Sequence, residues 1–352
     1  MKVLITIGEN EFPNPYIRTL ADSMRKKGIK VTCSSSEIWN NWEAYDIIHV
    51  QWPQVLLRAG MLSIEPLKIL FSNIKKEGKV VVATCHNMRP HYSNNHLFHE
   101  SYEVVYNNTD YFVHLGEFSK NLFEEKYPDA KHVVIPHHIY DNLYNADSLP
   151  NRQSALKKLG LSDRYRYVLC MGAFRNEEEI NLAQYASDYL AHKGFRILAP
   201  ALYRYQISYR HPLFTLRSYL NFRKAARSHS DIICNGRFVS DKLLPYYYAA
   251  SDLAFIHRKE ILNSGNVPMA MLMGKVIVGP DTGNVGILLH EIDNPVFNPV
   301  CIQTLESAFD NAIILIGEDK GRVNQKYAVD HFSSSIVASE YDIFYHNILL
   351  QK

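Results

Sequence analysis

A basic loop followed by small polar residues contains the residue types that bind a phosphate group. Arg258 and Lys259 follow an apolar stretch at residues 253–256 after one histidine, and the run Asn-Ser-Gly then precedes a helical pattern at residues 267–273. The first backbone N–H groups of a helix lack partners within the helix and carry a partial positive charge, so a helix start attracts anions. The same residues could instead only cap the helix, which stabilises it by about 1 kcal/mol. The candidate anion-binding residues here are Arg258, Asn263, Ser264 and Gly265.

A glycine turn at residues 172–176 is a second candidate for anion binding. Gly172 follows an apolar stretch at residues 167–171 and would let the backbone approach a ligand closely. Arg175 adds a fixed positive charge. The acidic residues 177–179 follow at once; they suit the positive start of a helix but would repel a phosphate nearby. Gly172 and Arg175 are the candidate anion-binding residues of this turn.

The polar loop at residues 84–91 has side chains that could act on a hydroxyl group. It follows an apolar strand pattern and contains His86, Asn87 and His91. Histidine has an intrinsic pKa near neutrality, so it can orient a hydroxyl or accept its proton. Polar loop residues can also do no more than satisfy the backbone of their own loop. A metal site in this region would lack a carboxylate at ligand spacing and is disfavoured; its histidines would be His86, His91, His96 and His99.

Strands and helices alternate along the chain, and this alternation predicts where the loops lie. The predicted strands are residues 3–7, 29–33, 46–50, 79–84, 111–115, 131–135, 167–171, 196–199, 232–234, 253–256 and 275–278. The predicted helices begin with one from Pro15 to Gly28 and continue with residues 67–76, 96–106, 118–126, 180–192, 241–250, 267–273, 302–316 and 335–350. Such alternation is typical of parallel sheets with helices on both faces. The predicted fold class is α/β, with two Rossmann-like doubly wound domains.

The chain is predicted to have a domain boundary in the polar stretch at residues 140–164, which is rich in Asn, Asp and Ser. Residues 1–150 would form the first domain and residues 151–332 the second. The C-terminal helix, within residues 333–352, is long enough to return to the first domain. Two facing domains would leave a central cleft between the carboxyl edges of their sheets, where open α/β sheets bind ligands. The candidate loops above all belong to that edge.

Composition excludes several other classes of protein. With 352 residues, 47% of them hydrophobic, the chain exceeds one ordinary domain. Its 38 Lys and Arg nearly balance 36 Asp and Glu, so overall charge does not indicate nucleic-acid binding. The five cysteines form no Cys-x-x-Cys pair, and no stretch reaches the roughly 18 apolar residues of a membrane span. We expect a cytoplasmic protein with reduced thiols, soluble or at most peripheral to a membrane.

One segment, residues 203–227, has a strong local charge bias. It carries six basic and no acidic residues, interleaved with six aromatic residues. Such a surface can lie on anionic lipid at the inner face of a membrane. The same composition is also compatible with a solvated helix whose aromatic side chains pack inward.

Several runs of the sequence occur together in one order. In the second half they are Arg237-Phe238-Val239, Leu244-Pro245-Tyr246-Tyr247, Ala250-Ser251-Asp252, Asn263-Ser264-Gly265 and the run from Met273 to Pro280. Together they resemble the donor half of GT-B glycosyltransferases, most of all the family-four-like enzymes that build bacterial surface polysaccharides. The runs at residues 14–18, 48–53 and 84–91 resemble the acceptor domain of the same enzymes. The likeness covers most of the chain.

The resemblance implies transfer of a hexose-type sugar from a nucleotide-diphosphate sugar to a hydroxyl of a glycan or lipid-linked acceptor. It implies no metal ion or other cofactor and no nucleic-acid partner. Ser264 and Gly265 would contact the diphosphate, Arg175 would offset its charge, and His86 would lie near the reacting sugar. The residues implied to contact the substrate are Trp52, Asn87 and His91.

The sequence departs from this family's pattern at three places. Family members typically carry two glutamates eight positions apart; Met269 occupies the second place, and Glu260, the candidate catalytic carboxylate, lies one position from the first. Glu178 stands where a basic residue is usual, and Arg258 and Lys259 are candidate replacements for its charge. Two other functions therefore stay open: a scaffold that binds nucleotide or sugar without turnover, and a sugar-nucleotide epimerase of the same fold.

Overall fold

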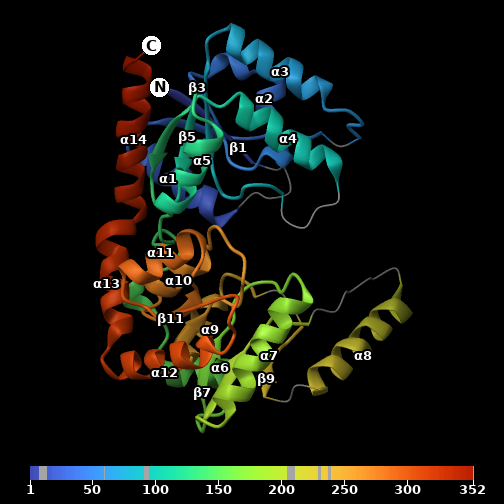
Figure 1. Cartoon of the computed structure of the whole chain (residues 1–352), viewed down its shortest axis with the longest axis vertical. Coiled ribbons are helices and arrows are strands. Elements are labelled where there is room, and N and C mark those ends of the chain that lie inside the picture. The colour runs from blue at the N-terminus through green and yellow to red at the C-terminus, as the bar shows by residue number, and fades with distance from the viewer. Residues whose placement is uncertain are drawn as a thin grey trace. The chain divides into compact units, whose positions relative to one another are not determined.

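The computed structural model describes residues 1–7, 14–58, 60–90, 95–203, 211–228, 231–236 and 239–351 (Figure 1). The chain divides into two compact units, one formed by Met1–Leu143 with His331–Lys352 and the other by Tyr144–Asp330. Each unit contains a parallel six-stranded sheet and its own hydrophobic core. The predicted α/β class, with two parallel sheets and surrounding helices, is confirmed.

The first sheet has the strand order β2-β1-β3-β4-β5-β6. Its strands are β1 (Lys2–Thr6), β2 (Lys30–Cys33), β3 (Ile47–Val50), β4 (Val80–Thr84), β5 (Tyr111–His114) and β6 (Lys131–Val134). The central strands β3 and β4 are buried along their whole length. Parallel strands covered on both faces read as nearly unbroken apolar runs, which is why the sequence located them.

The helices of the first unit are α1 (Pro15–Lys26), α2 (Glu37–Asn40), α3 (Glu65–Lys76), α4 (His96–Asn107), α5 (Glu117–Lys126) and α14 (Ser334–Leu350). Helix α1 starts where predicted because the Asn14 Oδ1 accepts a hydrogen bond from the Tyr16 N–H at 3.0 Å, and Pro15 occupies a position that needs no N–H donor. The four-residue helix α2 and the 3-10 turns at Trp42–Ala44 and Pro53–Leu56 were not predicted, because they are too short to show a period.

The C-terminal helix α14 packs against α1 and belongs to the first unit (Figure 1). Both carboxylate oxygens of Asp141 accept from the Ser334 backbone N–H at 3.2 Å, at the start of the helix. Tyr341 and Tyr345, on the buried side of α14, are completely inaccessible to solvent. The end of the chain therefore forms part of the core that supports the first sheet.

The second sheet has the strand order β12-β11-β10-β7-β8-β9. Its strands are β7 (Arg166–Leu169), β8 (Phe195–Leu198), β9 (Ile232–Ile233), β10 (Leu253–Phe255), β11 (Val276–Pro280) and β12 (Val296–Phe297). Its helices are α6 (Arg152–Leu159), α7 (Glu177–Ala191), α8 (Pro212–Ser228), α9 (Leu244–Ala250), α10 (Asn266–Leu272), α11 (Gly283–Glu291), α12 (Thr304–Gly317) and α13 (Lys320–Phe332). The sequence analysis did not identify β12, α11 or α13.

Much of the polar stretch predicted as a linker is folded into the second unit. It contains a 3-10 turn at Ala146–Ser148 and helix α6, which packs against α9. The guanidinium of Arg152 donates to the Ala250 carbonyl and the Asp252 carboxylate, both at 2.9 Å, and to the Tyr165 carbonyl at 3.0 Å. A single arginine makes all three contacts, and its partners lie 13 to 100 positions away in the sequence, so the composition of the stretch does not predict them.

Candidate functional site

Two predicted site residues of the first unit, His86 and Trp52, are in contact. They follow β4 and β3, which are neighbours in the sheet, so their loops start side by side at its carboxyl edge. The imidazole of His86 stacks on the indole of Trp52, with ring centroids 4.4 Å apart and 16° between the planes. The ring of Tyr16 meets His86 edge-on, with centroids 5.1 Å apart. These contacts hold the half-buried imidazole in one orientation.

Behind His86 lies a hydrogen-bonded network that was not predicted. His86 Nε2 is 2.8 Å from Gln51 Oε1, and Gln51 Nε2 is 3.1 Å from His49 Nε2. His49 Nε2 is also 2.7 Å from Thr84 Oγ1, and its Nδ1 is 2.6 Å from the Tyr345 hydroxyl. The signal in the sequence was the placement of His49 and Gln51 two positions apart in and after an otherwise apolar strand.

The histidines of this network are neutral at pH 7. Burial lowers the pKa of His49 to about 3, and burial together with the neighbouring His49 lowers the pKa of His86 to about 3. A general base works best when its pKa is close to the operating pH. In this environment His86 is therefore better suited to bind a hydroxyl group than to remove its proton.

A second aromatic group surrounds Tyr16. The ring of His138 stacks on Tyr16 with centroids 4.7 Å apart and 12° between the planes, and the ring of His137 is tilted by 53° to Tyr16 with centroids 4.7 Å apart. His138 Nε2 is also 3.0 Å from the Tyr16 carbonyl oxygen. Burial lowers the pKa of both histidines. These residues follow β6 and support the wall of the site next to His86; the His-His pair was overlooked in the sequence.

The remaining predicted residues of the first unit are less well defined. Asn87 is half-buried, and its backbone carbonyl accepts a hydrogen bond from the Tyr106 hydroxyl at 2.9 Å. His91 lies outside the described residues. His96 pairs with Glu100 on the surface of α4 at 2.7 Å. Among the residues that the structure describes, no three His, Cys, Asp or Glu side chains are grouped to hold a metal ion.

The glycine turn of the second unit lies between β7 and α7 and contacts the start of α10. Gly172 has a φ of 103°, and a Cβ there would lie 3.3 Å from Asn266 Nδ2. That amide nitrogen donates to the Met171 carbonyl at 2.8 Å. A side chain at position 172 would therefore be strained and would crowd Asn266. The turn needs glycine for both reasons, whether or not a ligand approaches it.

Arg258, predicted to bind an anion, is paired inside the protein. Its guanidinium is 3.6 Å from the carboxylate of Glu179 and donates to the Ala173 carbonyl at 3.2 Å. Glu179 also accepts from the Arg175 backbone N–H at 2.8 Å. Because the Arg258 and Glu179 side chains are 7% and 5% exposed, their charges compensate each other in the interior. Glu179 is the last residue of the acidic run that was predicted to repel a phosphate. Its contacts show that this residue stabilises the glycine turn.

Other positive charges of this loop are closer to solvent. The Arg175 side chain is exposed, and the Lys259 ammonium lies 3.7 Å from Glu178 in a surface ion pair. Exposed ion pairs of this kind are weak. Arg175 and Lys259 are therefore more exposed to solvent than Arg258.

The residues before α10 make local contacts within the second unit. Ser264 Oγ accepts from the Asn266 backbone N–H at 3.3 Å, which is a local helix-start contact. Asn263 Oδ1 accepts from the side chain of Asn284 at 2.7 Å, so this asparagine connects the loop to α11. The loop after β10 and the start of α11 approach each other closely. A Cβ on Gly283, whose φ is 60°, would lie 2.2 Å from the Ile261 carbonyl oxygen. Gly265 precedes the helix in a helical conformation.

Glu260 and Met269, which lie next to and at the two glutamate positions of the family, differ in burial. Glu260 is exposed on the loop after β10. Met269 is 7% exposed within α10 and forms part of the apolar interior. A glutamate at position 269 would have to be accommodated in this largely apolar helix, so the methionine is consistent with the local packing.

His257, next to Arg258, is a further buried histidine that the sequence analysis did not select. Its ring stacks on Phe174 of the glycine turn with centroids 4.0 Å apart. Burial, together with the charges of Arg258 and Arg175, lowers its pKa to about 3. This stack is a second connection between the loop after β10 and the glycine turn.

Folding stability is expected to fall as the pH drops below about 6.5. Burial is the main reason that His49, His114 and His257 have pKa values lowered to about 3. Between about pH 6.5 and pH 3 the unfolded chain, whose histidines have ordinary pKa values, binds protons that the folded chain does not bind. Each such histidine lowers the free energy of unfolding by up to about 1.4 kcal/mol for each pH unit of acidification. Urea unfolding at about pH 7, 6 and 5 measures the effect. A constant unfolding midpoint over this range would contradict it.

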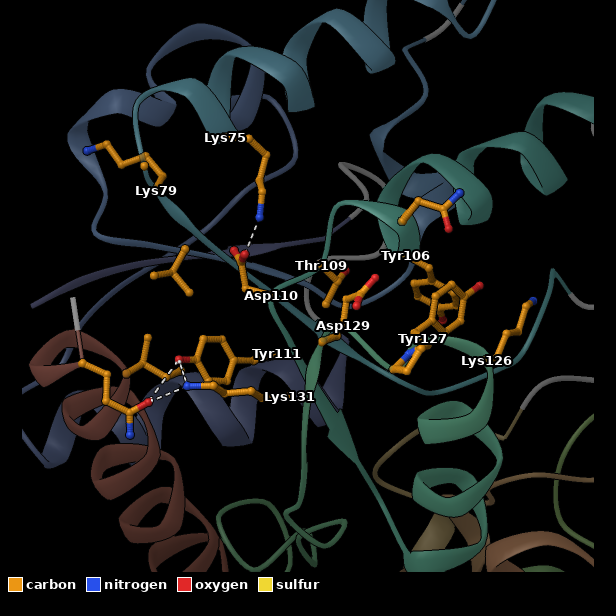
Figure 2. A pocket seen from close by; sticks show the side chains of 17 residues that line it. Lys75, Lys79, Tyr106, Thr109, Asp110, Tyr111, Lys126, Tyr127, Asp129 and Lys131 are labelled. Carbon is orange, nitrogen blue, oxygen red and sulfur yellow. Dashed lines mark hydrogen bonds and ion pairs between the residues drawn. The ribbon is translucent and has the colours of Figure 1, made fainter.

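A depression of about 590 Å³ lies at the opposite edge of the first sheet (Figure 2). It is lined by residues at the amino ends of β4, β5 and β6 and by the end of α14. Three of its lysines make hydrogen bonds or ion pairs: Lys75 pairs with Asp110, Lys79 Nζ donates to the Tyr45 carbonyl at 2.9 Å, and Lys131 Nζ donates to Gln351 Oε1 at 2.8 Å. The residues predicted from the sequence do not line it, so we do not identify it with the candidate site.

Comparison with solved structures establishes the fold at low sequence identity. Sucrose-phosphate synthase from Thermosynechococcus elongatus matches with a TM-score of 0.74 and 12% identity over 100% of both chains. HepE from Anabaena, in complex with UDP-glucose, matches with a TM-score of 0.70 and 12% identity over 99% of this chain and 100% of that one. A Listeria monocytogenes protein described as a candidate UDP-N-acetylglucosamine 2-epimerase matches with a TM-score of 0.62 and 13% identity over 100% and 97% of the two chains.

No protein-family model and no curated protein matches the sequence. The likeness to these structures is one of fold, in which each of two units contains a parallel sheet with surrounding helices.

Proposed function

We propose that this protein transfers a sugar from a nucleotide-diphosphate sugar to a hydroxyl group of an acceptor. The observation that carries the proposal is the match of essentially the whole chain to HepE, which was crystallised with UDP-glucose. The polar side chains at the carboxyl ends of β3, β4, β7 and β10 support it, because open α/β sheets bind ligands at that edge. The proposed type is a metal-independent hexosyltransferase of the family-four-like group, acting in surface-polysaccharide assembly.

The second unit is proposed to hold the donor. Gly172 brings backbone to the carboxyl end of β7, and the start of α10 contributes the hydroxyl of Ser264 and the backbone N–H of Gly265. Arg175 and Lys259 supply positive charge that is accessible from solvent. Without a metal ion, such charges and N–H dipoles must stabilise the diphosphate as it leaves.

The first unit is proposed to bind the acceptor, a glycan or a lipid-linked saccharide. The indole of Trp52, one face of which is covered by His86, is a flat apolar group of the kind on which sugar rings stack, and neutral His86 and Asn87 can hydrogen-bond to hydroxyl groups. His91 is kept as a candidate from the sequence. In the reaction, the acceptor oxygen bonds to the anomeric carbon while the bond from that carbon to the diphosphate breaks. The electron pair leaves with the diphosphate, and the acceptor proton passes to it or to a carboxylate such as Glu260.

Titration calorimetry with UDP and GDP, followed by mass spectrometry of reactions with a panel of sugar nucleotides and acceptors, tests the proposal. Nucleotide binding and a product heavier by one sugar residue are the expected results. Binding without turnover would favour the scaffold function. Conversion of the sugar nucleotide to an isomer would favour the epimerase, for which the Listeria neighbour is the specific observation. Absence of binding to every nucleotide tested would refute donor binding by this chain.

We also propose that α8 contacts an anionic membrane surface. In the described residues, no helix is long and apolar enough to cross a membrane, so any such contact would be peripheral. Leu213, Leu216 and Leu220 are 81%, 53% and 57% exposed and recur at helical spacing. The basic residues on or beside the same face are Arg217, Arg223, Lys224 and Arg227, and the helix contains no acidic residue. Together these seven residues form the α8 face.

Changing the three leucines of the α8 face to serine is expected to weaken vesicle binding by at least about tenfold, because the helix loses the apolar area that it would insert. Sedimentation with phosphatidylcholine vesicles, with and without phosphatidylglycerol, measures binding. Leu62→Ser is the matched control, since Leu62 is 93% exposed in the other unit. Equal sedimentation of the triple variant and the wild type, or binding that does not depend on phosphatidylglycerol, would contradict the proposal.

A further inference from the structure

Four lysines line the depression at the amino edge of the first sheet. This depression of about 590 Å³, the amino-edge depression, is lined by residues of α3, α4, α5, β4, β5, β6 and α14 and of the turns beside them (Figure 2). Its lysines are Lys75, Lys79, Lys126 and Lys131, and the acidic residues of its lining are Asp110 and Asp129. The lysines come from four separate parts of the chain, so the fold gathers them into a local excess of positive charge.

An ion pair neutralises one of these lysines. Lys75 pairs with Asp110, and the second carboxylate oxygen of Asp110 accepts a hydrogen bond from the Val81 backbone N–H at 2.8 Å. Asp110 thus uses one oxygen for Lys75 and the other for the edge of β4, so it does not compensate a second lysine.

Two further lysines donate to neutral oxygens. Lys79 Nζ donates to the backbone carbonyls of Glu43 and Tyr45, at 2.6 and 2.9 Å. Lys131 Nζ donates to the side-chain oxygen of Gln351 at 2.8 Å. These hydrogen bonds orient the two ammonium groups but leave their charges uncompensated.

The ammonium groups of Lys126 and Lys131 also lie over tyrosine rings. The distance to the ring centre is 5.1 Å from Lys126 Nζ to Tyr127 and 5.4 Å from Lys131 Nζ to Tyr111. An aromatic ring attracts a cation through its quadrupole and carries no net charge. Neither lysine pairs with a carboxylate in the part of the chain that the structure describes, and both side chains are exposed. They therefore present net positive charge to solvent.

The size and polarity of the amino-edge depression indicate the kind of ligand that fits it. Exposed ammonium groups attract anions, and lysine binds phosphate and carboxylate groups as a point charge. The volume lies within the range of about 300–1,000 Å³ that is typical of sites for small organic ligands. The exposed amides of Asn107 and Gln351, which belong to the lining, can hydrogen-bond to hydroxyl groups. A small organic anion with hydroxyl groups matches these features.

We propose that the amino-edge depression binds a sugar that carries a phosphate or a carboxylate group. The lysines support the anionic group, whereas its attachment to a sugar rests on the proposed function, in which the protein acts on sugars. His86 follows the carboxyl end of β4, and the depression lies at the amino end of the same strand. The bound sugar would therefore occupy a second site, separate from the one around His86.

Titration calorimetry of the full-length protein with glucose 1-phosphate, glucuronate and glucose tests the proposal. The first two probes distinguish a phosphate from a carboxylate, and glucose measures binding without charge. We expect at least one charged sugar to bind more tightly than glucose. Lys126→Gln/Lys131→Gln, which removes both exposed charges, is expected to weaken that binding at least about tenfold. Failure of both charged sugars to bind, or equally tight binding of glucose, would overturn the proposal.

Two variants show whether the effect comes from this depression. Lys26→Gln/Lys27→Gln is the matched control, because it removes two exposed lysines at the end of α1 that do not line the depression. Asp129→Asn removes the exposed acidic residue of the lining and is expected to raise the affinity about twofold to fivefold. An equal loss of affinity in both double variants, or none in Lys126→Gln/Lys131→Gln, would overturn the proposal.

A single variant replaces the double variant if that one does not fold. Lys126→Gln removes a side chain whose contact is with the Tyr127 ring, so it leaves the hydrogen bonds of β6 in place. Weaker binding of the charged sugar by Lys126→Gln would support the proposal, and unchanged binding would overturn it.

A sugar phosphate that bound in the second unit would behave differently. Arg175→Gln/Lys259→Gln removes the exposed charges proposed to hold the donor. If it abolishes binding of glucose 1-phosphate and Lys126→Gln/Lys131→Gln does not weaken it, the ligand is at the donor site and the proposal is wrong. If the protein turns over no sugar nucleotide while the charged sugar binds as expected, the proposed function fails and the amino-edge site stands.

Discussion

An Arg258→Met variant is expected to lose about 3–5 kcal/mol of folding stability. The side chains of Arg258 and Glu179 are 7% and 5% exposed, and their charged groups are 3.6 Å apart. Methionine preserves much of the side-chain length but not the charge, so the Glu179 carboxylate would remain buried without its cation. Urea unfolding followed by circular dichroism measures the loss. An unfolding midpoint equal to that of the wild type would show that the pair contributes nothing.

A second substitution identifies the cause of that loss. Adding Glu179→Gln to Arg258→Met removes the buried charge and is expected to recover most of the stability. Glutamine keeps an oxygen that can accept from the Arg175 backbone N–H, which is 2.8 Å from the carboxylate in the native protein. If the double variant is no more stable than Arg258→Met, the loss of folding stability comes instead from the missing hydrogen bond between the Arg258 guanidinium and the Ala173 carbonyl, which is 3.2 Å long.

The same double variant tests whether the Arg258 guanidinium contacts the donor. If the variant folds and binds UDP as the wild type does, the positive charge acts within the protein only. If it folds and no longer binds UDP, Arg258 also takes part in donor binding.

The fold could be predicted from the sequence because its signals are local. Parallel strands buried on both faces, such as β4, are continuous apolar runs, and Asn14-Pro15 marks the start of α1. The helix α2 was missed because its four residues make little more than one turn and so show no helical period.

The candidate site was predictable only in part, because its chemistry depends on pairs that are distant in sequence. The type and loop position of His86 identified it, but the pKa of about 3 arises from burial and from His49. Arg258 was selected for its charge, yet that charge is compensated by Glu179, which the sequence presented only as one of three acids before a helix. No local pattern indicates that Tyr345 contacts His49.

Replacing His86 with alanine is expected to lower kcat for sugar transfer about a hundredfold or more, with little change in folding stability. The imidazole stacks on Trp52 and is directed by Gln51, so its removal would leave a substrate hydroxyl without a defined partner. Because His86 is half-buried in a loop, alanine opens little of the core. His96→Ala is the matched control, since the His96 side chain is 85% exposed on the helix after the same loop. Unchanged turnover in His86→Ala would remove His86 from the site.

The pH dependence of kcat distinguishes the two roles that His86 could have. With a pKa of about 3, His86 stays neutral across the working range, so a residue that only binds a hydroxyl should produce no step in kcat near pH 6.5. His86→Gln keeps an acceptor oxygen and should then recover part of the activity lost in His86→Ala. A step in kcat near pH 6.5 that is present in the wild type and absent from His86→Gln would show that His86 titrates during the reaction. The pKa of His86 would then rise when the negatively charged donor binds, and the imidazole would take the acceptor proton.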